Sequence, residues 1–462
     1  MRTTAALLLR TCTMACALWA LPQPLLAQLY TLNAGEFHAG GALVFDSTEQ
    51  RLYATFAYPE WNGYQVNSVA VWDGTEWTSV GGGFLDGGGY YAALHDGQYF
   101  LSGAMENWVN GYDIYHLGRW DGTEWHSCGE PDGYTSFLKI GEELWIGSAF
   151  DSIGDVAISE IARWNGTQWE AFGDPIPPNE GITHCGDIYQ GHYYFGGTHA
   201  GSGIFGGADI IMWTGEEWIV PGGGTPDPAM TILQAMKSYH GKLYIGGGIQ
   251  SGPSHNIIIW NGSSYEGFFP DLVYNVAGVY QMEVIGDKLY IAGSWLFAGD
   301  TRTYGLLIYD GTTLCGVGYS GLGPELEEIR QFAGDSHRIY FNTTNYVLSG
   351  DSVNFFGYWN QSDGPDTCIT IPVGMRESEV DRVLPVFPNP ADEVLHVELG
   401  MQMGKGSAVI VVHDGSGRMA LQQEARIDER GTATLAVGAL SPGFYHGAVS
   451  GDKRRIFRFI KH

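Results

Sequence analysis

Positive charge is scarce in this sequence of 462 residues. It has 23 lysines and arginines against 51 aspartates and glutamates, which gives a formal net charge of −28. Residues 28–375 carry 10 basic and 40 acidic side chains, whereas residues 376–462 carry 11 of each. Such an acidic body repels phosphate backbones and argues against nucleic acid as a partner. A requirement for solubility explains the acidity, and cation binding is the more specific alternative.

Cysteine is also rare. Of the six cysteines, Cys12 and Cys16 lie in an N-terminal leader, and the others are Cys128, Cys185, Cys315 and Cys368. Four cysteines permit three pairings, and the sequence does not choose among them. Because no C-x-x-C pair occurs, neither a zinc site nor a redox motif is indicated. We expect unpaired, partly buried thiols or one incidental disulfide.

No apolar run is long enough to predict a transmembrane helix. The stretch Thr11–Leu26 follows Arg2 and Arg10, is interrupted by two prolines, and ends at the small residue Ala27. This pattern predicts a signal peptide over residues 1–27, with cleavage after Ala27. A lipoprotein signal centred on Cys16 is the weaker alternative, because the residues before that cysteine are a poor lead-in.

Catalytic motifs are missing as well. The sequence contains no HExxH, GxSxG or P-loop pattern. His184 and Cys185 could form a base and a nucleophile. However, neighbours on a strand point to opposite faces, and no third residue is identifiable to orient the base. We therefore predict no catalytic residue, no metal ligand and no cofactor. The ligand-binding residues stay unassigned, and the sequence leaves open whether the chain is an enzyme.

Glycine, at 68 residues, and aromatic residues, at 13%, are instead abundant. Both recur in a six-residue motif whose first aromatic residues are spaced by 44 to 50 positions. Its copies are Trp72-Asp-Gly-Thr-Glu-Trp77, Trp120-Asp-Gly-Thr-Glu-Trp125, Trp164-Asn-Gly-Thr-Gln-Trp169, Trp213-Thr-Gly-Glu-Glu-Trp218, Trp260-Asn-Gly-Ser-Ser-Tyr265 and Tyr309-Asp-Gly-Thr-Thr-Leu314, with a half copy at Trp359-Asn360. Asp-Gly between apolar segments predicts a tight type I′ hairpin turn with the two aromatic residues facing each other.

A second motif runs in phase with the first and also has seven copies. They are Leu52-Tyr53, Tyr99-Phe100, Leu144-Trp145, Tyr193-Tyr194, Leu243-Tyr244, Leu289-Tyr290 and Ile339-Tyr340. Each lies in a further hairpin, so every repeat of about 48 residues holds four strands. The sequence therefore predicts an all-β, seven-bladed β-propeller over residues 28–361.

The ends of this predicted ring indicate how it closes. Residues 28–37 resemble Glu76–Phe84, the last strand of the first full repeat, while the seventh repeat lacks a good last strand. We expect the mature N-terminal strand to complete the seventh blade, which removes both exposed edges. The segment Cys368–Pro372 is the rival closing strand.

On these motifs the repeats resemble kelch and galactose-oxidase-type propellers. The resemblance concerns architecture only, since propellers host many activities. Aligned on the second motif, the repeats place seven different residues at one predicted position lining the central channel. They are Val44, Tyr91, Ser136, Cys185, Ala235, Gln281 and Gln331.

The repeat ends before the C-terminus. Residues 362–382 read as a linker, and residues 383–462 contain short alternating strands separated by glycine and proline, which predicts a small Ig-like β-sandwich. Three motifs stand out in this domain. They are Pro388-Asn389-Pro390, a turn with Asp414 and Gly417, and a turn with Gly443 and Tyr445, followed by a basic last strand that begins Lys453-Arg454-Arg455.

These elements, in this order, resemble the type A C-terminal sorting domain of the type IX secretion system of Bacteroidota. The resemblance implies export across the inner membrane by the signal peptide and across the outer membrane by the sorting domain. The secretion machinery would be a partner, and the protein would be released or held at the cell surface.

For the propeller we expect a binding role toward a protein or glycan ligand. A secreted glycan-active enzyme, such as a lyase, hydrolase or oxidase, is the alternative. A structural or adhesive role at the cell envelope is a third hypothesis.

Overall fold

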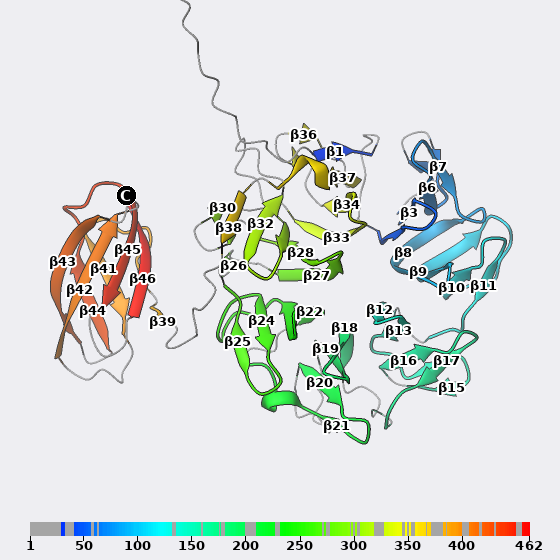
Figure 1. Cartoon of the computed structure of the whole chain (residues 1–462), viewed down its shortest axis with the longest axis horizontal. Coiled ribbons are helices and arrows are strands. Elements are labelled where there is room, and N and C mark those ends of the chain that lie inside the picture. The colour runs from blue at the N-terminus through cyan, green and yellow to red at the C-terminus, as the bar shows by residue number, and fades with distance from the viewer. Residues whose placement is uncertain are drawn as a thin grey trace, which may run out of the picture. The chain divides into compact units, whose positions relative to one another are not determined.

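Each repeat folds into a sheet of four antiparallel strands, and seven such sheets follow one another around a central axis (Figure 1). The structure, a computed structural model, describes residues 29–32, 41–56, 60–61, 64–131, 135–158, 160–174, 176, 181–198, 209–226, 232–269, 272–273, 278–295, 297–298, 301–302, 305–317, 328–343, 347–348, 351–352, 356–365, 367–370, 382–384, 386–399, 406–414, 418–428, 431–449 and 455–462. The predicted signal peptide lies outside these ranges. Two compact units, Met1–Ile371 and Pro372–His462, divide the chain.

The seven blades confirm the predicted propeller. From the inner strand outward, blade 1 holds β2 (Leu43–Asp46), β3 (Arg51–Thr55), β6 (Val69–Trp72) and β7 (Trp77–Ser79). Blade 2 holds β8 (Phe84–His95), β9 (Gln98–Trp108), β10 (His116–Trp120) and β11 (Trp125–Ser127). Blade 3 holds β12 (Ser136–Ile140), β13 (Glu143–Gly147), β16 (Ile161–Trp164) and β17 (Trp169–Ala171). Blade 4 holds β18 (Ile182–Tyr189), β19 (His192–Thr198), β20 (Ile210–Trp213) and β21 (Trp218–Ile219). Blade 5 holds β22 (Leu233–Tyr239), β23 (Lys242–Gly247), β24 (Ile257–Trp260) and β25 (Tyr265–Gly267).

Blades 6 and 7 are built from the remaining repeats. Blade 6 holds β27 (Gly278–Ile285), β28 (Lys288–Ser294), β31 (Leu306–Tyr309), β32 (Thr313–Val317) and an added fifth strand, β38 (Thr367–Thr370). Blade 7 holds β33 (Ile329–Gly334), β34 (Arg338–Thr343), β37 (Phe356–Asn360) and β1 (Leu29–Thr31). Within the described ranges, no helix has the length and apolarity needed to cross a membrane.

Short β-segments decorate the loops of several blades. They are β4 (Glu60–Trp61) with β5 (Tyr64–Gln65), β14 (Ser152–Ile153) with β15 (Val156–Ala157), β26 (Leu272–Val273) with β29 (Phe297–Ala298) and β30 (Thr301–Arg302), and β35 (Val347–Leu348) with β36 (Asp351–Ser352). Two single 3₁₀ turns are η1 (Pro221–Gly223) and η2 (Gln361–Asp363).

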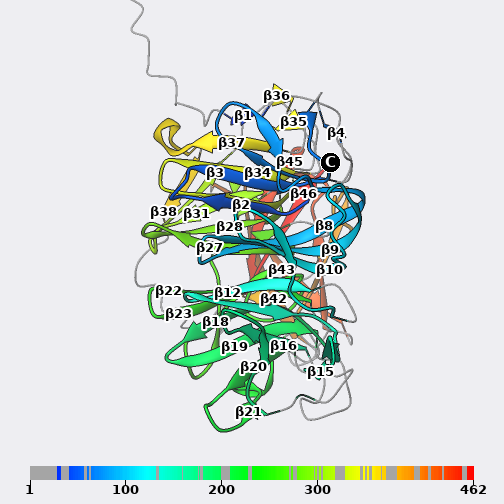
Figure 2. The same cartoon turned by 90° about the vertical axis from the view of Figure 1, so that its right-hand side faces the viewer.

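The N-terminal strand closes the ring, as predicted. Strand β1 pairs antiparallel with β37, with Leu29 opposite Trp359 and Thr31 opposite Gly357. Figures 1 and 2 both show the blue β1 beside the yellow β37. The rival segment does form a strand, but β38 pairs with β32 on the outer edge of blade 6. Residues 367–370 of the expected linker therefore belong to the propeller.

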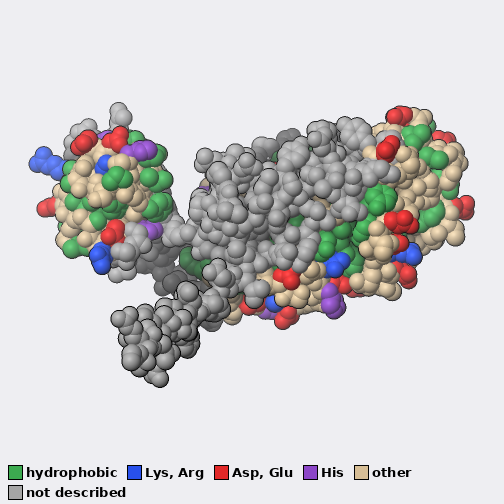
Figure 3. All heavy atoms as spheres, turned by 90° about the horizontal axis from the view of Figure 1, so that it is seen from above, with side chains coloured by type: hydrophobic (Ala, Val, Ile, Leu, Met, Phe, Trp, Pro, Cys, Tyr) green, Lys and Arg blue, Asp and Glu red, His purple; other side chains and the backbone are tan. Residues whose placement is uncertain are grey.

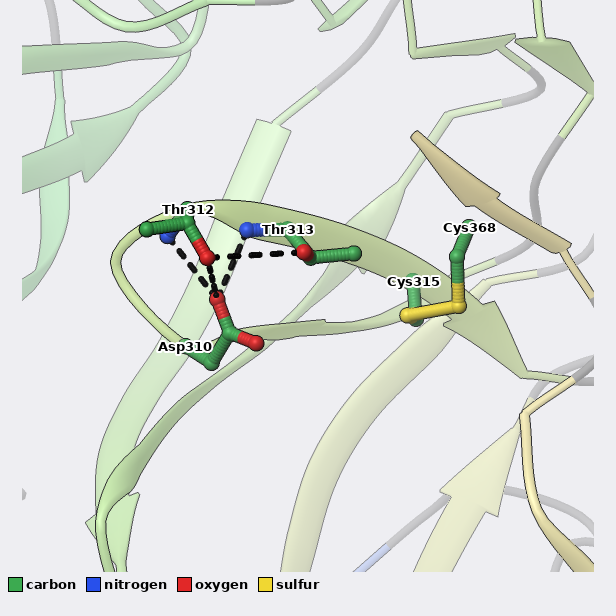
Figure 4. Close-up of a disulfide and its surroundings, with 5 residues drawn as sticks. All are labelled: Asp310, Thr312, Thr313, Cys315 and Cys368. Carbon is green, nitrogen blue, oxygen red and sulfur yellow. Dashed lines mark hydrogen bonds between the residues drawn. A yellow bond between two sulfur atoms is a disulfide. The ribbon is translucent and has the colours of Figure 1, made fainter. Parts of the chain in front are cut away.

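A disulfide fixes β38 in place. Cys315 on β32 and Cys368 on β38 lie opposite each other in the ladder and are bonded (Figure 4). The sequence left all three pairings open, and the structure selects this one, with Cys128 and Cys185 free and buried. The two bonded residues are 53 positions apart, and β33, β34 and β37 lie between them. The bond thus encloses the three strands that blade 7 takes from the end of the propeller chain.

Removing this bond should weaken the propeller. A cross-link across a loop of this length reduces the conformational entropy of the unfolded chain by the equivalent of about 4 kcal/mol. We expect Cys315→Ser with Cys368→Ser to lower the free energy of unfolding by about that amount, measured by urea denaturation of the oxidised protein. Reduced wild-type protein is the control and should match the variant. Equal stability of the oxidised wild type and the variant would contradict the expectation.

Glycines let neighbouring blades approach at their outer strands. The aromatic residues of the first motif pair across strands three and four, as in Trp120 with Trp125, whose rings are 5.8 Å apart. Gly81, which follows the outer strand of the preceding blade, lies under this pair at φ +58°. A Cβ atom there would come within 2.3 Å of Trp120 and 2.6 Å of Trp125. Gly173 and Gly222 repeat the arrangement at two other junctions.

This contact gives a matched test of inter-blade packing. Gly81→Ala adds a clash of about 1–3 kcal/mol to a backbone penalty of about 1–2 kcal/mol. Gly154→Ala is the control, because Gly154 has the same φ (+58°), but a Cβ atom added there would meet no other residue within 4 Å. We expect Gly81→Ala to lower the thermal midpoint clearly more than Gly154→Ala does. Equal shifts would show that only backbone conformation matters here.

The C-terminal unit is a separate all-β domain, in agreement with the predicted small sandwich. Its eight strands form one sheet in the order β39 (Arg382–Val383), β46 (Arg455–Lys461), β45 (Gly443–Val449), β42 (Gly406–Asp414), β43 (Met419–Ile427), β44 (Thr432–Ala436), β41 (Val394–Glu398), β40 (Val386–Phe387). The sheet nearly closes on itself, because Ala391 bridges Lys461 on β46. Leucine, valine, isoleucine and aromatic side chains fill its interior.

Candidate functional site

The Pro388-Asn389-Pro390 motif lies against the last strand of the C-terminal unit. The side-chain oxygen of Asn389 accepts a hydrogen bond from the backbone N–H of Ile460 on β46, at 2.9 Å. Two residues later, the N–H of Ala391 donates to the Ile460 carbonyl at 2.7 Å. Pro388 and Pro390 are exposed on either side of Asn389, and the peptide bonds before both prolines are cis. The motif therefore docks the chain between β40 and β41 onto the C-terminal strand.

The Gly443–Tyr445 motif contacts the same strand from the other side. Gly443 pairs with Lys461, and Tyr445 pairs with Phe459 in the β45–β46 ladder. The Tyr445 ring is buried and stacks on Phe459 with centroids 5.4 Å apart, while its hydroxyl donates to the Ser441 carbonyl at 2.8 Å. Neither partner could be found from the sequence motif alone, because both contacts depend on the register of the final hairpin.

The third motif lies one strand further from the terminus. Asp414 pairs with Tyr445 across β42 and β45, and its carboxylate accepts from the backbone N–H of Arg418 at 3.0 Å, so it stabilises the turn into β43. Arg455 is the first residue of β46. Gly417, Lys453 and Arg454 fall outside the described residues. The described part of the predicted motif thus gathers at β46 and the two strands that follow it in the sheet.

In the propeller, two of the predicted channel-lining residues, Gln281 and Gln331, hold neighbouring blades together. Both ends of the Gln281 amide bond the backbone of Phe332 on the next blade, at 3.0 and 2.8 Å. The side-chain oxygen of Gln331 accepts from the N–H of Leu43, again on the next blade, at 3.0 Å. In these two blades, the residue at the aligned position is therefore explained by a hydrogen bond to the next blade.

One of the seven predicted positions is misplaced. Val44 pairs with Tyr53, whereas the other six residues pair two positions beyond the corresponding aromatic residue, as Cys185 does with Gly196. The turn between β2 and β3 spans four residues, compared with two in blades 2 to 6, and this shifts the alignment. In the register of the structure, the position equivalent to Cys185 in blade 1 is Ala42, whose N–H bonds the Thr55 hydroxyl.

A hollow of about 570 Å³ opens where the inner strands of blades 3 to 6 end. Its charged lining includes Lys139, Asp187, Lys237 and Glu283, one residue from each blade. Lys237 and Glu283 form an ion pair of 2.9 Å. Asp187 is buried, its carboxylate accepts from the N–H of Ser238 at 2.5 Å, and burial raises the pKa of this carboxyl despite the nearby Lys237. Sequence analysis missed the hollow because it brings together residues about 50 positions apart with no shared motif.

His184 and Cys185 do not form a base–nucleophile pair. A β-bulge separates Thr183 and Cys185 in the ladder, and the Cys185 thiol is buried and faces the Gly196 carbonyl at 3.5 Å. Burial raises the pKa of this thiol far above its ordinary value and lowers the pKa of His184. The environment therefore suppresses both the thiolate and the imidazolium.

The Asp-Gly motifs form a turn that differs from the predicted type I′ turn. Trp72 pairs directly with Trp77, so the loop holds four residues, of which Gly74 has positive φ. The Asp73 carboxylate accepts from the N–H groups of Thr75 and Glu76 at 2.8 and 3.0 Å. Asn165 and Asn261 make the same bonds in their blades. The acidic or amide side chain thus caps the loop, and two-residue turn chemistry is not needed.

One such turn also contains a group with metal-ligand chemistry. Asp121, Glu124 and His126 present ligand atoms within 4.8 Å of one another at an exposed position. Asp121 already caps its turn and contacts the His126 ring at 2.8 Å, so the group is explained by the turn itself.

The capping carboxylates predict an acid sensitivity. Hydrogen bonds from the Glu76 backbone, and then from Thr75, lower the pKa of Asp73 from 3.8 to about 2. A depressed pKa means that the carboxylate stabilises the fold above pH 4 and that this contribution is lost as the pH falls toward 2. Asp73→Asn with Asp121→Asn and Asp310→Asn should leave stability at pH 7 nearly unchanged. The variant should lose less stability than the wild type between pH 4 and 2 in urea unfolding. Identical losses would contradict this account.

Comparisons with known proteins identify the C-terminal unit. Residues 385–461 match the family described as secretion system C-terminal sorting domain. Solved structures similar to the chain include YCF48 bound to a D1 peptide (12% identity, TM-score 0.41, covering 74% of this chain and 99% of that one) and YjhT (11% identity, TM-score 0.35, covering 65% and 99%). A GH74 xyloglucanase from Xanthomonas campestris is also similar (12% identity, TM-score 0.35, covering 72% and 43%).

No curated protein matches the chain. The low identities and TM-scores transfer no activity to the propeller. The sorting domain, in contrast, matches over nearly the whole C-terminal unit. The chain is therefore a secreted β-propeller protein that carries a type IX secretion sorting domain at its C-terminus.

Proposed function

We propose that the chain is a ligand-binding propeller displayed at the cell surface or released from it. In this proposal residues 1–27 direct passage across the inner membrane, and the type IX machinery then recognises the domain that starts near residue 383. The kelch-like character of the repeats and an origin in Bacteroidota belong to the same proposal. The observation that carries it is the gathering of Asn389, Gly443 and Tyr445 around β46.

The position of these residues gives the last strand a defined shape. Tyr445 and Phe459 stack inside the domain, while Ile460 faces outward and is held through its backbone by Asn389. A strand that is pinned from both sides presents its outward face in one register. We propose that the secretion machinery reads this face.

Loss of the domain should stop export at the periplasm. We expect the chain without residues 383–462 to accumulate there, because the signal peptide is retained and the outer-membrane signal is gone. Fractionation and immunoblotting of periplasm, cell surface and medium measure the outcome. Normal surface display of the truncated chain would overturn the sorting assignment.

A point substitution tests the terminal strand more finely. Asn389→Ala removes the side-chain bond to Ile460 at a cost of about 1 kcal/mol. The domain should therefore stay folded and β46 should stay paired with β45, while the end of β46 loses one of its bonds to the Asn389–Ala391 segment. Gln423→Ala is the matched control, because its side chain also bonds backbone, at Ala436 N–H (3.1 Å), but on β44. We expect periplasmic accumulation of the first variant and normal export of the second. Equal export of both would show that the bond between Asn389 and Ile460 is not required for export.

For the propeller, the proposed ligand site is the hollow at the inner strands of blades 3 to 6, with a protein or a glycan as the ligand. We favour binding over a glycan-active enzyme because the two innermost carboxylates are already bonded. Glu283 pairs with Lys237, and Asp187 accepts from the backbone of Ser238.

A further inference from the structure

We infer that the hollow at the inner ends of blades 3 to 6 binds a basic segment of a peptide, through lysine or arginine side chains. This inference deepens the proposed binding function and rests on it. Four consecutive inner strands, β12, β18, β22 and β27, and the turns that follow β12, β22 and β27 line the hollow. Its volume of about 570 Å³ suits several side chains rather than an ion.

Charge at this inner-strand position is not a general requirement of a blade, although the charges present also bond neighbouring blades to each other. Asp187, Lys237 and Glu283 occupy one equivalent position, opposite the second aromatic residue of the second motif. The other four blades place apolar residues there: Val44, Ala93, Leu138 and Ala333. Burying charge is unfavourable, and the apolar blades show that the fold does not require it. Charges that are confined to the blades around one hollow therefore point to a ligand.

The net negative charge of the lining favours a positively charged ligand. Glu142 and Asp287 add two exposed carboxylates in the turns of blades 3 and 6. The lining then holds four carboxylates and two ammonium groups, and one of these, Lys237, is already paired with Glu283. The surrounding propeller is itself strongly acidic, and Figure 3 shows acidic side chains on the described part of the face that it draws. Such a field draws in cations and repels anions.

The aromatic lining favours a peptide over an amino sugar. Sugar rings commonly stack on an open aromatic face. The aromatic residue that lines the hollow with a hydrophobic ring, Tyr239, is buried, and the His240 imidazole covers it at 3.9 Å with the planes 16° apart. Its hydroxyl donates to the Asp287 carbonyl at 2.7 Å. The exposed carboxylates of Glu142 and Asp287 remain as contacting groups, and these suit ammonium and guanidinium donors.

Binding by the full mature chain tests the inference. The probes are a labelled short peptide of alternating lysine and serine, its glutamate–serine counterpart and a chitosan oligomer, all at about 0.15 M salt, where long-range attraction is screened. We expect the lysine peptide alone to bind. Glu142→Gln with Asp287→Asn should raise its Kd about tenfold, since two partly exposed ion pairs are lost.

A charge-matched variant separates the hollow from the acidic surface. Glu76→Gln with Glu217→Gln removes the same charge from exposed turns at the outer strands of blades 1 and 4, and should change the Kd less than about twofold. Equal weakening by both variants would overturn the inference, because attraction would then be general. Selective, hollow-dependent binding of chitosan or of the glutamate peptide would overturn the ligand class and leave the proposed binding function standing. If none of the three probes binds, both the proposed ligand class and the role of the hollow as its binding site are overturned. The sorting half of the proposed function is tested separately by the export of the Asn389 variant.

Discussion

The pairing of β1 with β37 is the contact on which the propeller depends. A ring of blades leaves no open edge only if its last blade is complete, and blade 7 obtains its outer strand from the other end of the chain. Nearby, the Asn342 side chain on blade 7 donates to the Gly41 carbonyl at 2.8 Å, and Gln331 accepts from Leu43. The closure is thus bonded within blade 7 at its outer strand, and between blades 7 and 1 near their inner strands.

The disulfide complements this closure by fixing the chain where it leaves blade 7. Cys368 lies just before the boundary of the second unit and is bonded to blade 6, so β37 is not the last anchored strand of the propeller. The entropy removed from the unfolded chain concerns the loop that contains β33, β34 and β37. These strands and β1 together form blade 7, in which the N-terminal strand pairs with the last strand of the repeats.

Local repeats predicted the propeller well because the strands of each blade are specified by one stretch of sequence. The paired aromatic residues, the Asp-Gly loops and the second motif gave seven blades, and the similarity of residues 28–37 to Glu76–Phe84 gave the closing strand. The disulfide, the role of Gln281 and the charged hollow could not be predicted in the same way. The disulfide joins the fourth strand of blade 6 to a strand that follows blade 7 in the sequence. Gln281 and the hollow join residues from neighbouring inner strands of different blades. Only the pairing and register of segments far apart in the sequence bring these residues together. In the C-terminal unit, the motif was visible from sequence, but Ile460 and Phe459 became its partners only through the fold of the last hairpin.

Amide hydrogen exchange of the mature protein is the most direct measurement of the closed ring. The account predicts that the amide of Leu32 exchanges slowly, since it donates to the Phe356 carbonyl at 3.2 Å, and that the amide of Tyr30, two positions earlier in the antiparallel β1–β37 ladder, is protected with it. Reduction of the Cys315–Cys368 bond should speed exchange in β38 before it affects β1. Exchange of residues 29–32 at the rate of a free peptide would contradict the account, because blade 7 would then be open.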